Sequence, residues 1–328
     1  MNFPKISIVT PSFNQGEFIE ETILSVLNQN YPNLEYFIVD GGSTDNSVEI
    51  IKKYEKKLTW WVSENDKGHA DALNKGFSRA SGDIMAWINS DDKYYPWTFK
   101  TVAEVFQSEN NIQWLQGKQS KFDSKGRLVS AWECHKNIFD FMSGNYAWIQ
   151  QESVFWTKEL WRKSGGYIDE NYKFMVDGEL WCRFFKYAEL FHLNIVIGGI
   201  RNHESRRALL NALQVDDEME RCTQQLFESL DENKQHEIKL IVHKLRSCRN
   251  TNKLFSILPK FLYNRLVNGI ERNKKEQIIQ SISEHLGGNY STYKMINFLD
   301  DSFKIDCMNF NPASWVQYPG KNKLLDKI

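Results

Sequence analysis

Residues 34–54 read LEYFIVDGGSTDNSVEIIKKY and contain one complete strand–turn–helix unit. LEYFIVD is a short apolar and aromatic run that predicts a strand ending at Asp40. Residues 41–45 supply a turn and a helix N-cap, and NSVEIIKKY predicts the helix that follows. A strand that leads directly into a helix is the building unit of a parallel α/β sheet.

The same alternation continues on both sides of this unit. Strands are predicted at residues 5–11, 59–64 and 83–89, and helices at residues 17–29 and 69–80. Alternation of this kind predicts right-handed βαβ crossovers. We therefore expect an α/β fold with a mainly parallel, twisted sheet flanked by helices.

The pattern is less regular after residue 113. We predict a hairpin around residues 123–126 and helices at residues 159–166 and 176–188. After Arg206 the chain becomes polar and helical, without further strand–helix alternation. The chain is therefore divided into a catalytic domain at residues 1–210 and a helical C-terminal region at residues 211–328.

Polar, small or acidic residues follow the three clearest predicted strands, at residues 11–14, 40–43 and 89–92. Ligands of parallel sheets bind beyond the carboxyl ends of the strands. We expect these three segments to meet at one edge of the sheet and to form the ligand site.

Asp91 and Asp92 are adjacent carboxylates directly after an apolar strand. Mg²⁺ and Mn²⁺ take oxygen ligands, often one or two carboxylates together with substrate phosphates. A metal at this place could bridge a diphosphate. Alternatively, the acidic segment only caps the next helix, which Pro96 would open.

Further candidates lie on the other predicted loops. The Asp40 carboxylate can accept a hydrogen bond from a nucleobase, and the two glycines after it either let a ligand approach or only make a tight turn. The segment at residues 64–77 contains four candidates for contact with a phosphate-bearing ligand: Lys67, Gly68, Asp71 and Asn74. Alternatively, the segment is only a charged loop that leads into a solvated helix.

Two acids begin the predicted helix at residues 176–188. Asp177 or Glu179 could act as a general base, or could simply lie favourably at a helix N-terminus. His203 is a candidate metal or phosphate ligand, although a single histidine is more often structural.

Taken together, five segments resemble the family-2 inverting glycosyltransferases, which have the glycosyltransferase-A fold. These segments occur in the order and rough spacing of that family, over about residues 4–205: PSFNQGEFI, VDGGSTDNS, SENDKGHADALNKG, SGDIMAWINSDD and MVDGELWCRF.

The resemblance implies a role for each matching residue. Asp40 would contact the donor nucleobase, Pro11 and Ser12 would line the base and ribose, and Ser90 would contact the donor. Asp91 would be the main ligand of Mn²⁺ or Mg²⁺, with Asp92 and His203 beside it. Asn89 replaces the first acid of the metal motif, which leaves the number of protein ligands open. Asp177 would be the catalytic base, with Glu179 as the alternative because Val176 replaces an acid of the family motif.

The implied activity is an inverting, metal-dependent hexosyl transfer from a nucleoside-diphosphate sugar to a glycan or lipid-linked acceptor, as in surface polysaccharide or glycolipid synthesis. Two alternatives are a sugar nucleotidyltransferase and a non-catalytic nucleotide-sugar-binding module. PSFNQGEF lacks the glycine-rich phosphate loop with a basic residue that a nucleotidyltransferase would need.

Composition narrows the partners and the location. A net charge of -1 argues against nucleic acid binding, and five scattered cysteines suggest neither a disulfide framework nor a zinc site. We find no leader peptide or apolar span and expect a cytoplasmic protein. Residues 238–275 contain ten basic residues and one acid. They predict either peripheral contact with the inner face of a membrane or a helical appendage with a basic face.

Overall fold

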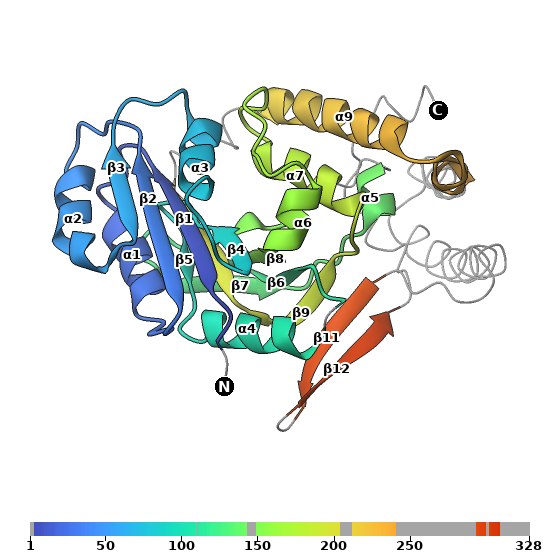
Figure 1. Ribbon diagram of the computed structural model, residues 1–328, viewed down its shortest axis with the longest axis horizontal. Coiled ribbons are helices and arrows are strands. Elements are labelled where there is room, and N and C mark those ends of the chain that lie inside the picture. Colours follow the sequence, from blue (N-terminus) through green and yellow to red (C-terminus); the bar gives the residue numbers. More distant parts are fainter. Residues whose placement is uncertain are drawn as a thin grey trace, which may run out of the picture.

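The computed structural model describes residues 3–109, 111–142, 149–203, 212–240, 293–299 and 302–308. In these parts of the chain, twelve strands form one sheet and helices pack on both of its faces (Figure 1). The main path of the sheet runs through β12 (Ser302–Met308), β11 (Tyr293–Leu299), β9 (Phe191–Val196), β6 (Trp114–Phe122), β8 (Val154–Thr157), β4 (Ile84–Trp87), β1 (Ile6–Ser12), β2 (Leu34–Asp40) and β3 (Trp60–Ser63).

The predicted α/β fold is confirmed. β1 lies parallel to β2 and to β4, and β2 lies parallel to β3, while β8 runs antiparallel to its neighbours β4 and β6. Three of the predicted helices connect the first strands: α1 (Ile19–Leu27), α2 (Ser47–Tyr54) and α3 (His69–Phe77). Their apolar positions, such as Ile23 on α1 and Leu73 on α3, are fully buried.

The middle of the chain completes the sheet. β6 and β7 (Leu128–Trp132) form the antiparallel hairpin predicted around residues 123–126, and the helices predicted after it are α6 (Lys158–Lys163) and α7 (Val176–Phe185). The sequence pattern indicated α4 (Thr98–Ser108) only as the helix after Pro96 in the capping alternative. It did not indicate β5 (Lys93–Tyr94), α5 (Ile138–Met142), β10 (Gly198–Arg201), the 3₁₀ helices η1 (Glu55–Lys57) and η2 (Gln151–Ser153), or the strands β8 and β9.

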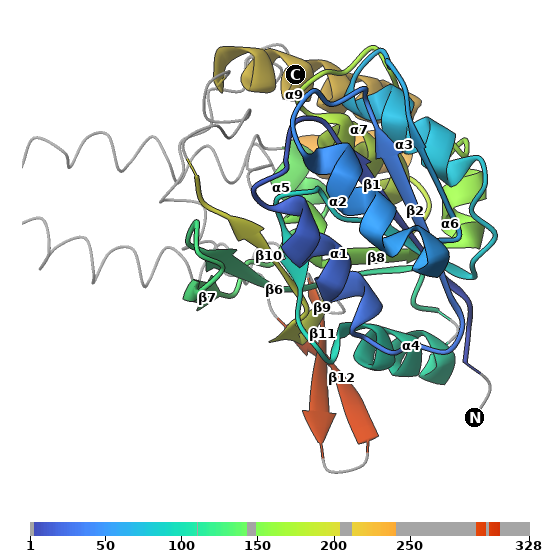
Figure 2. The same ribbon diagram turned by 90° about the vertical axis from the view of Figure 1, so that its left-hand side faces the viewer.

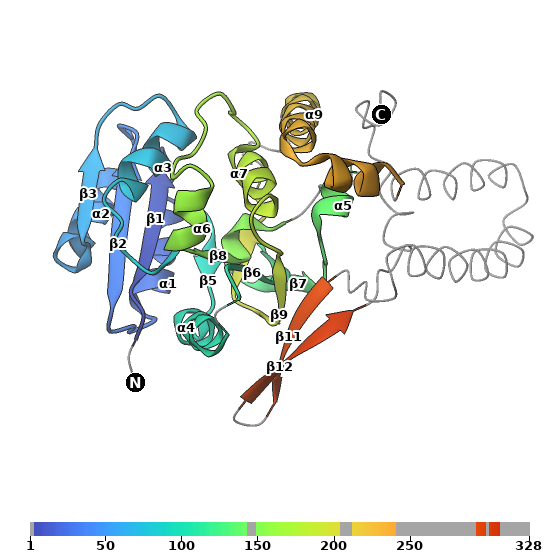
Figure 3. The same cartoon turned by 45° about the vertical axis from the view of Figure 1, so that its right-hand side comes forward.

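The C-terminal region is both helical and stranded. α9 (Ala212–Ser229) lies along α7, and a further helical run covers residues 232–240 (Figures 1 and 3). β11 pairs in parallel with β9, and β12 pairs with β11 as a hairpin that the helical prediction did not include. In the described ranges, no helix has the length and apolar character needed to cross a membrane. Of the basic segment at 238–275, residues 241–275 lie outside the described residues.

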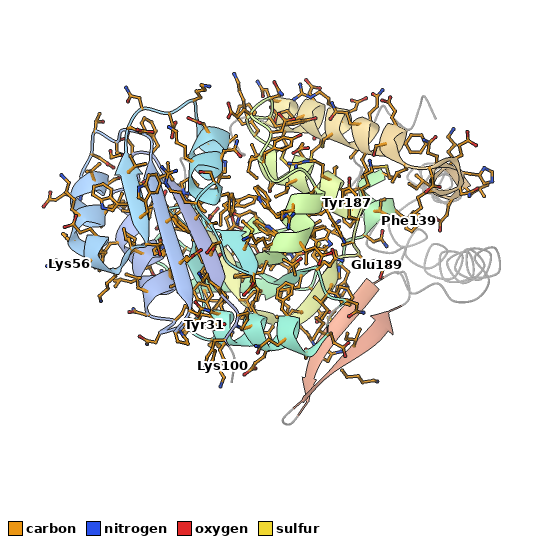
Figure 4. The ribbon with its side chains drawn as sticks, viewed as in Figure 1. Tyr31, Lys56, Lys100, Phe139, Tyr187 and Glu189 are labelled. Atoms are coloured by element: carbon orange, nitrogen blue, oxygen red, sulfur yellow. The ribbon has the colours of Figure 1, made fainter. Side chains whose placement is uncertain are left out.

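A cluster of tryptophans joins the sheet to α7. Trp87 on β4 stacks on Trp181 of α7 with 5.8 Å between ring centroids, and Trp156 of β8 contacts both rings. All three side chains are fully buried, and side chains fill the space between sheet and helices (Figure 4). The stacked pair fixes the middle of α7 relative to the end of β4, where the predicted metal motif begins.

Candidate active site

The three predicted ligand segments meet at one edge of the sheet, as expected. Ser12 lies opposite Asp40 in the register of β1 and β2, which run side by side in Figure 2. β4 pairs with β1 on its other side. Asn14 joins the first two segments, since its amide N–H donates to Ser43 Oγ at 2.8 Å and its Oδ1 accepts from Thr44 N at 2.9 Å.

Two side chains at the end of β1 are available to a ligand. Ser12 is 5% exposed, and in the described part of the chain its buried hydroxyl has no hydrogen-bond partner. A buried hydroxyl without a partner costs about 1–3 kcal/mol, which a ligand or a water would remove. Phe13 next to it is 59% exposed, whereas Pro11 is buried within the strand.

Asp40 is fully buried at the end of β2. Its Oδ1 accepts a hydrogen bond from Ser43 Oγ at 2.5 Å, while its Oδ2 accepts from Ser43 N at 2.9 Å and from Ser63 Oγ at 2.7 Å. These bonds fold the turn after β2 and join it to β3. The contact between Asp40 and a nucleobase stays a prediction, and the carboxylate supports the turn from inside.

The loop after β3 packs closely against Gly41 and Gly42. A Cβ atom on Gly41 would lie 2.8 Å from Asp66 Oδ2, and one on Gly42 would lie 2.5 Å from Asn65 Oδ1, so side chains there would push the loop away. Asp66 Oδ1 accepts from Gly68 N at 2.8 Å. Burial, together with the nearby Asp71 carboxylate, raises the pKa of Asp66.

Lys67 and Gly68 lie where an anion can reach them. The Lys67 side chain is 81% exposed. Gly68 has φ +114° and is the N-cap of α3, with open space where a Cβ atom would be. A helix N-terminus with a nearby lysine favours phosphate binding, so the predicted phosphate contact remains a consistent proposal.

Asp71 and Asn74 hold neighbouring segments in place. Asp71 Oδ2 accepts from Lys67 N at 3.0 Å and shapes that turn. Asn74 bonds to the backbone of Ile168 with both ends of its amide, at 2.7 Å through Oδ1 and 2.8 Å through Nδ2. These bonds give Asn74 a structural role in place of the predicted donor contact.

The acidic motif after β4 does not cap the next helix. β5 follows it, and α4 begins only at Thr98, with Trp97 as an N-cap that makes no side-chain cap bond. The capping interpretation is therefore wrong. Ser90 is buried, and its carbonyl accepts a hydrogen bond from Thr22 Oγ1 of α1 at 3.0 Å.

Asn89 connects the motif to its surroundings. Its Oδ1 lies 3.2 Å from His69 Nε2, and its Nδ2 donates to Asp92 Oδ2 at 3.2 Å and to Gln151 Oε1 at 3.3 Å. An amide at this place supplies hydrogen-bond donors to acidic neighbours. A third carboxylate beside Asp92 and Glu152 would instead repel them.

Asp92 has a structural environment. It is 2% exposed, and its Oδ1 accepts a hydrogen bond from Arg201 N at 2.7 Å. Burial, together with the charges of Asp91 and Glu152, raises the pKa of Asp92 well above its usual range. Because its oxygens already bond within the protein, this geometry does not support the metal role predicted for Asp92.

Arg201 fixes the backbone of the motif. Its side chain is buried, and its Nε donates to the carbonyl oxygen of Asp91 at 2.7 Å. Its guanidinium also pairs with Glu21 of α1 at 2.5 Å. The buried Arg201 guanidinium thus holds the main chain of Asp91 and makes no hydrogen bond to the Asp91 carboxylate in the described residues.

Asp91 and His203 form the pair that can hold a metal ion. Asp91 Oδ2 lies 2.9 Å from His203 Nε2, with side-chain exposures of 22% and 7%. No group of three or more histidine, cysteine, aspartate or glutamate side chains with metal-site geometry occurs within the described residues. A metal at this pair would therefore need ligands from the substrate.

Asp177 lies in the first turn of α7, and its Oδ1 accepts a hydrogen bond from Gly178 N at 2.8 Å. Burial raises the pKa of Asp177 to about 6, and the Glu152 and Glu218 carboxylates add to the rise against the Gly178 bond. Glu152 also interacts with Asp92. Asp177 and Asp92 of the acidic motif therefore both lie near the buried Glu152 carboxylate.

Glu179 is engaged in a buried ion pair. Its two oxygens accept hydrogen bonds from Arg183 Nε and Nη2, both at 2.7 Å, and it is 5% exposed. The same guanidinium donates to the Ser164 carbonyl at 2.5 Å. A bidentate pair of this kind has a structural role, which favours Asp177 over Glu179 as the base.

The sequence analysis missed Glu152, Arg201 and Asp66. Glu152 follows two buried glutamines and lies shortly before β8. A run of polar residues next to an apolar strand was the one sequence feature that could have pointed to Glu152. Arg201 lies two residues before His203, and Asp66 directly precedes Lys67. Their partners are far away in the chain, so their roles emerge only from the fold.

Comparison with known proteins adds independent findings. The profile of glycosyl transferase family 2 matches residues 7–169. A putative teichuronic acid biosynthesis glycosyltransferase, TuaG of Bacillus subtilis, is 42% identical over 94 residues, which cover 28% of this chain and 37% of TuaG. A glycosyltransferase of Rickettsia typhi is 24% identical over 235 residues, which cover 64% of this chain and 69% of that protein.

Two solved structures share the fold. S. aureus TarS 1–349 in complex with UDP-GlcNAc has a TM-score of 0.59 at 17% identity, covering 93% of this chain and 97% of TarS. The mannosyltransferase PcManGT from Pyrobaculum calidifontis, in complex with GDP-Man and Mn²⁺, has a TM-score of 0.54 at 15% identity, covering 86% of this chain and 84% of that chain.

The fold and the edge site, together with these matches, define an enzyme class: the protein is a glycosyltransferase. More narrowly, it belongs to glycosyl transferase family 2 and has a glycosyltransferase-A-like fold. The nucleotidyltransferase and non-catalytic alternatives are thereby set aside.

Proposed function

We propose that the protein transfers a sugar from a nucleoside-diphosphate sugar to an acceptor hydroxyl with inversion at the sugar C1, and that Asp177 is the general base. The observation that carries this proposal is the place of Asp177 in the first turn of α7, where it shares the neighbour Glu152 with the acidic motif and where burial raises its pKa to about 6. A base is most effective when its pKa lies near the working pH. Its competitor Glu179 is neutralised by Arg183.

The donor would bind at the edge formed by β1, β2 and the loop after β3. Phe13 offers an exposed ring on which a nucleobase can stack, and Ser12 offers the unpartnered hydroxyl. Lys67 and the start of α3 would face the diphosphate. The solved structures of similar fold, TarS with UDP-GlcNAc and PcManGT with GDP-Man, support the proposal that the donor is a nucleoside-diphosphate sugar.

The residues present fit a divalent metal ion, Mn²⁺ or Mg²⁺. Asp91 Oδ2 and His203 Nε2 lie 2.9 Å apart in a hydrogen bond, and oxygen and imidazole nitrogen are donors that such ions accept. These two side chains would hold the ion together with the donor diphosphate. When bound there, the ion would neutralise charge on the departing diphosphate.

The chain itself would handle the proton. Asp177 accepts the proton of the acceptor hydroxyl as that oxygen forms its bond to the sugar C1. The bond between C1 and the diphosphate oxygen breaks, and its electron pair leaves with the nucleoside diphosphate. Attack from the face opposite the leaving group inverts the configuration at C1. Asn89 and Arg201 keep the motif in place during this step.

The acceptor would be a glycan or a lipid-linked glycan of a surface polysaccharide, a proposal supported by the teichuronic acid assignment of the relative TuaG. Residues 238–275 would then bring the enzyme to the inner face of the membrane.

A donor screen tests the proposal directly. Purified enzyme is incubated with UDP- and GDP-sugars, Mn²⁺ and candidate acceptors, and released nucleoside diphosphate is measured. NMR coupling constants at the new anomeric centre then distinguish inversion from retention. We expect inversion and loss of turnover in Asp177→Asn. A retained configuration, or full turnover in that variant, would contradict the mechanism.

A further inference from the structure

α9 packs closely on α7, the helix that carries Asp177. Both helices follow residues 7–169, which the family profile matches. α9 lies along α7 in Figures 1 and 3. A Cβ atom on Gly178 would collide with the sulfur of Met219, and Cys182 Sγ lies 3.7 Å from Cys222 Sγ. Contacts at two successive turns of α7 leave little freedom between the helices.

One α9 side chain reaches the backbone just before α7. Glu218 Oε1 accepts a hydrogen bond from Lys173 N at 2.9 Å. Glu218 Oε2 accepts from Phe174 N and from Met175 N, both at 2.9 Å. Three consecutive amides are therefore held by one carboxylate from another helix.

α7 does not supply this anchor itself. Met175 is its N-cap residue and makes no side-chain cap bond. A negative charge near a helix N-terminus is favourable, and it orients the first turn through the amides that it holds. Asp177 lies in that first turn, and its Oδ1 accepts a hydrogen bond from the neighbouring Gly178 N at 2.8 Å. The position of its carboxylate therefore depends on the backbone that Glu218 holds.

We propose that Glu218 is a positioning residue for the transfer reaction, which holds the start of α7 and thereby places Asp177 against the acceptor hydroxyl. The inference rests on the proposed role of Asp177.

Glu218 also contributes charge at the base. The groups that face Asp177 are Glu152 from η2 and Glu218 from α9, and both carboxylates raise the pKa of Asp177, after burial as the largest cause. Removing the Glu218 charge should therefore lower the pKa of Asp177, whereas shortening the side chain should not. Placement and charge can thus be separated by two variants.

The test compares Glu218→Gln, Glu218→Asp and the control Asp217→Asn, which removes the same charge from an exposed neighbouring position. Glu218→Gln should reduce kcat about ten- to hundred-fold, since small misplacement of a reacting group has effects of this size. The acid limb of its kcat–pH profile should move to lower pH, because the Glu218 charge that raises the pKa of Asp177 is gone. Glu218→Asp should reduce kcat without that movement. Asp217→Asn should do neither, and donor KM should stay within about two-fold in all three.

Two results would overturn the positioning role. One is a kcat near wild type in both Glu218 variants. The other is a loss of kcat matched by an equal loss of donor affinity and a lowered melting temperature, which indicates general destabilisation. If Glu218→Gln fails to fold, Glu218→Asp decides the question. Failure of the underlying function gives a different result, namely full turnover in Asp177→Asn.

Discussion

Replacement of Asp177 by Asn should make the protein more stable and less active at the same time. The fold raises the pKa of this carboxyl from 3.8 to about 6. Each pKa unit corresponds to about 1.4 kcal/mol, so ionising Asp177 in the folded protein costs at most about 3 kcal/mol. The mostly buried side chain keeps some solvent exposure, which reduces this to about 1–2 kcal/mol. The Asn variant avoids that cost.

The sign of the pH dependence follows from linkage. The folded protein holds the Asp177 proton more tightly than the unfolded chain, whose pKa is 3.8. Wild-type stability therefore falls as pH rises from that value to about 6, and the loss is complete above it. In the variant this part of the pH dependence is absent. Its melting temperature should exceed wild type by about 2–6 °C at pH 8 and match it near pH 3.5.

Activity should change in the opposite direction. Loss of a general base reduces the rate by about 10²–10⁴, with donor affinity unchanged. Glu179→Gln is the matched control, because it removes the charge that pairs with Arg183 and should lower the melting temperature while retaining far more turnover. Calorimetric melting and initial rates of both variants decide the assignment. A collapse of turnover in Glu179→Gln beside normal turnover in Asp177→Asn would refute the reasoning.

Three further predictions concern binding. Asp91→Asn should abolish the Mn²⁺ dependence of nucleoside-diphosphate binding in calorimetry, whereas Asp92→Asn should mainly lower the melting temperature; equal metal dependence in both would contradict the metal pair. Ser12→Ala should weaken donor binding about two- to ten-fold with an unchanged melting temperature, whereas Asp40→Asn should lower both, because Asp40 is buried under the turn. Removal of residues from 241 onward should reduce binding to anionic vesicles at low salt, and binding that ignores salt would count against an electrostatic contact.

The first half of the fold was readable from the sequence because each strand there is followed by a helix with its own apolar face. LEYFIVD predicted β2 with its observed bounds. The predicted hairpin implied the end of β6 but not its first residues, because Gln116 and Gln119 are buried within the strand and interrupt the apolar pattern. β8 is short, and only its pairing with β4 and β6 makes it a strand. These elements are stabilised by tertiary contacts rather than by local preference.

The site divides in the same way. The edge where Ser12, Asp40 and the acidic motif meet follows from the parallel topology, so it could be predicted. Arg201 could not, because it reaches the carbonyl of Asp91 across 110 positions of sequence. The choice between Asp177 and Glu179 also needed the fold, since only the structure shows which carboxylate Arg183 neutralises.

Burial and hydrogen bonding, rather than residue type, separate the acids at this edge by role. Asp40 is ionisable and fully buried, but serine hydroxyls and amides saturate its oxygens, so it is suited to holding a turn. Asp91 keeps an oxygen for His203 and remains 22% exposed, which suits a ligand for a cation. Asp177 is desolvated without a compensating cation, so its proton affinity rises, which a base requires and a structural acid does not. The free-energy cost of ionising Asp177 in the folded protein is therefore expected at the reacting group. It should disappear in Asp177→Asn, in which that side chain is neutral.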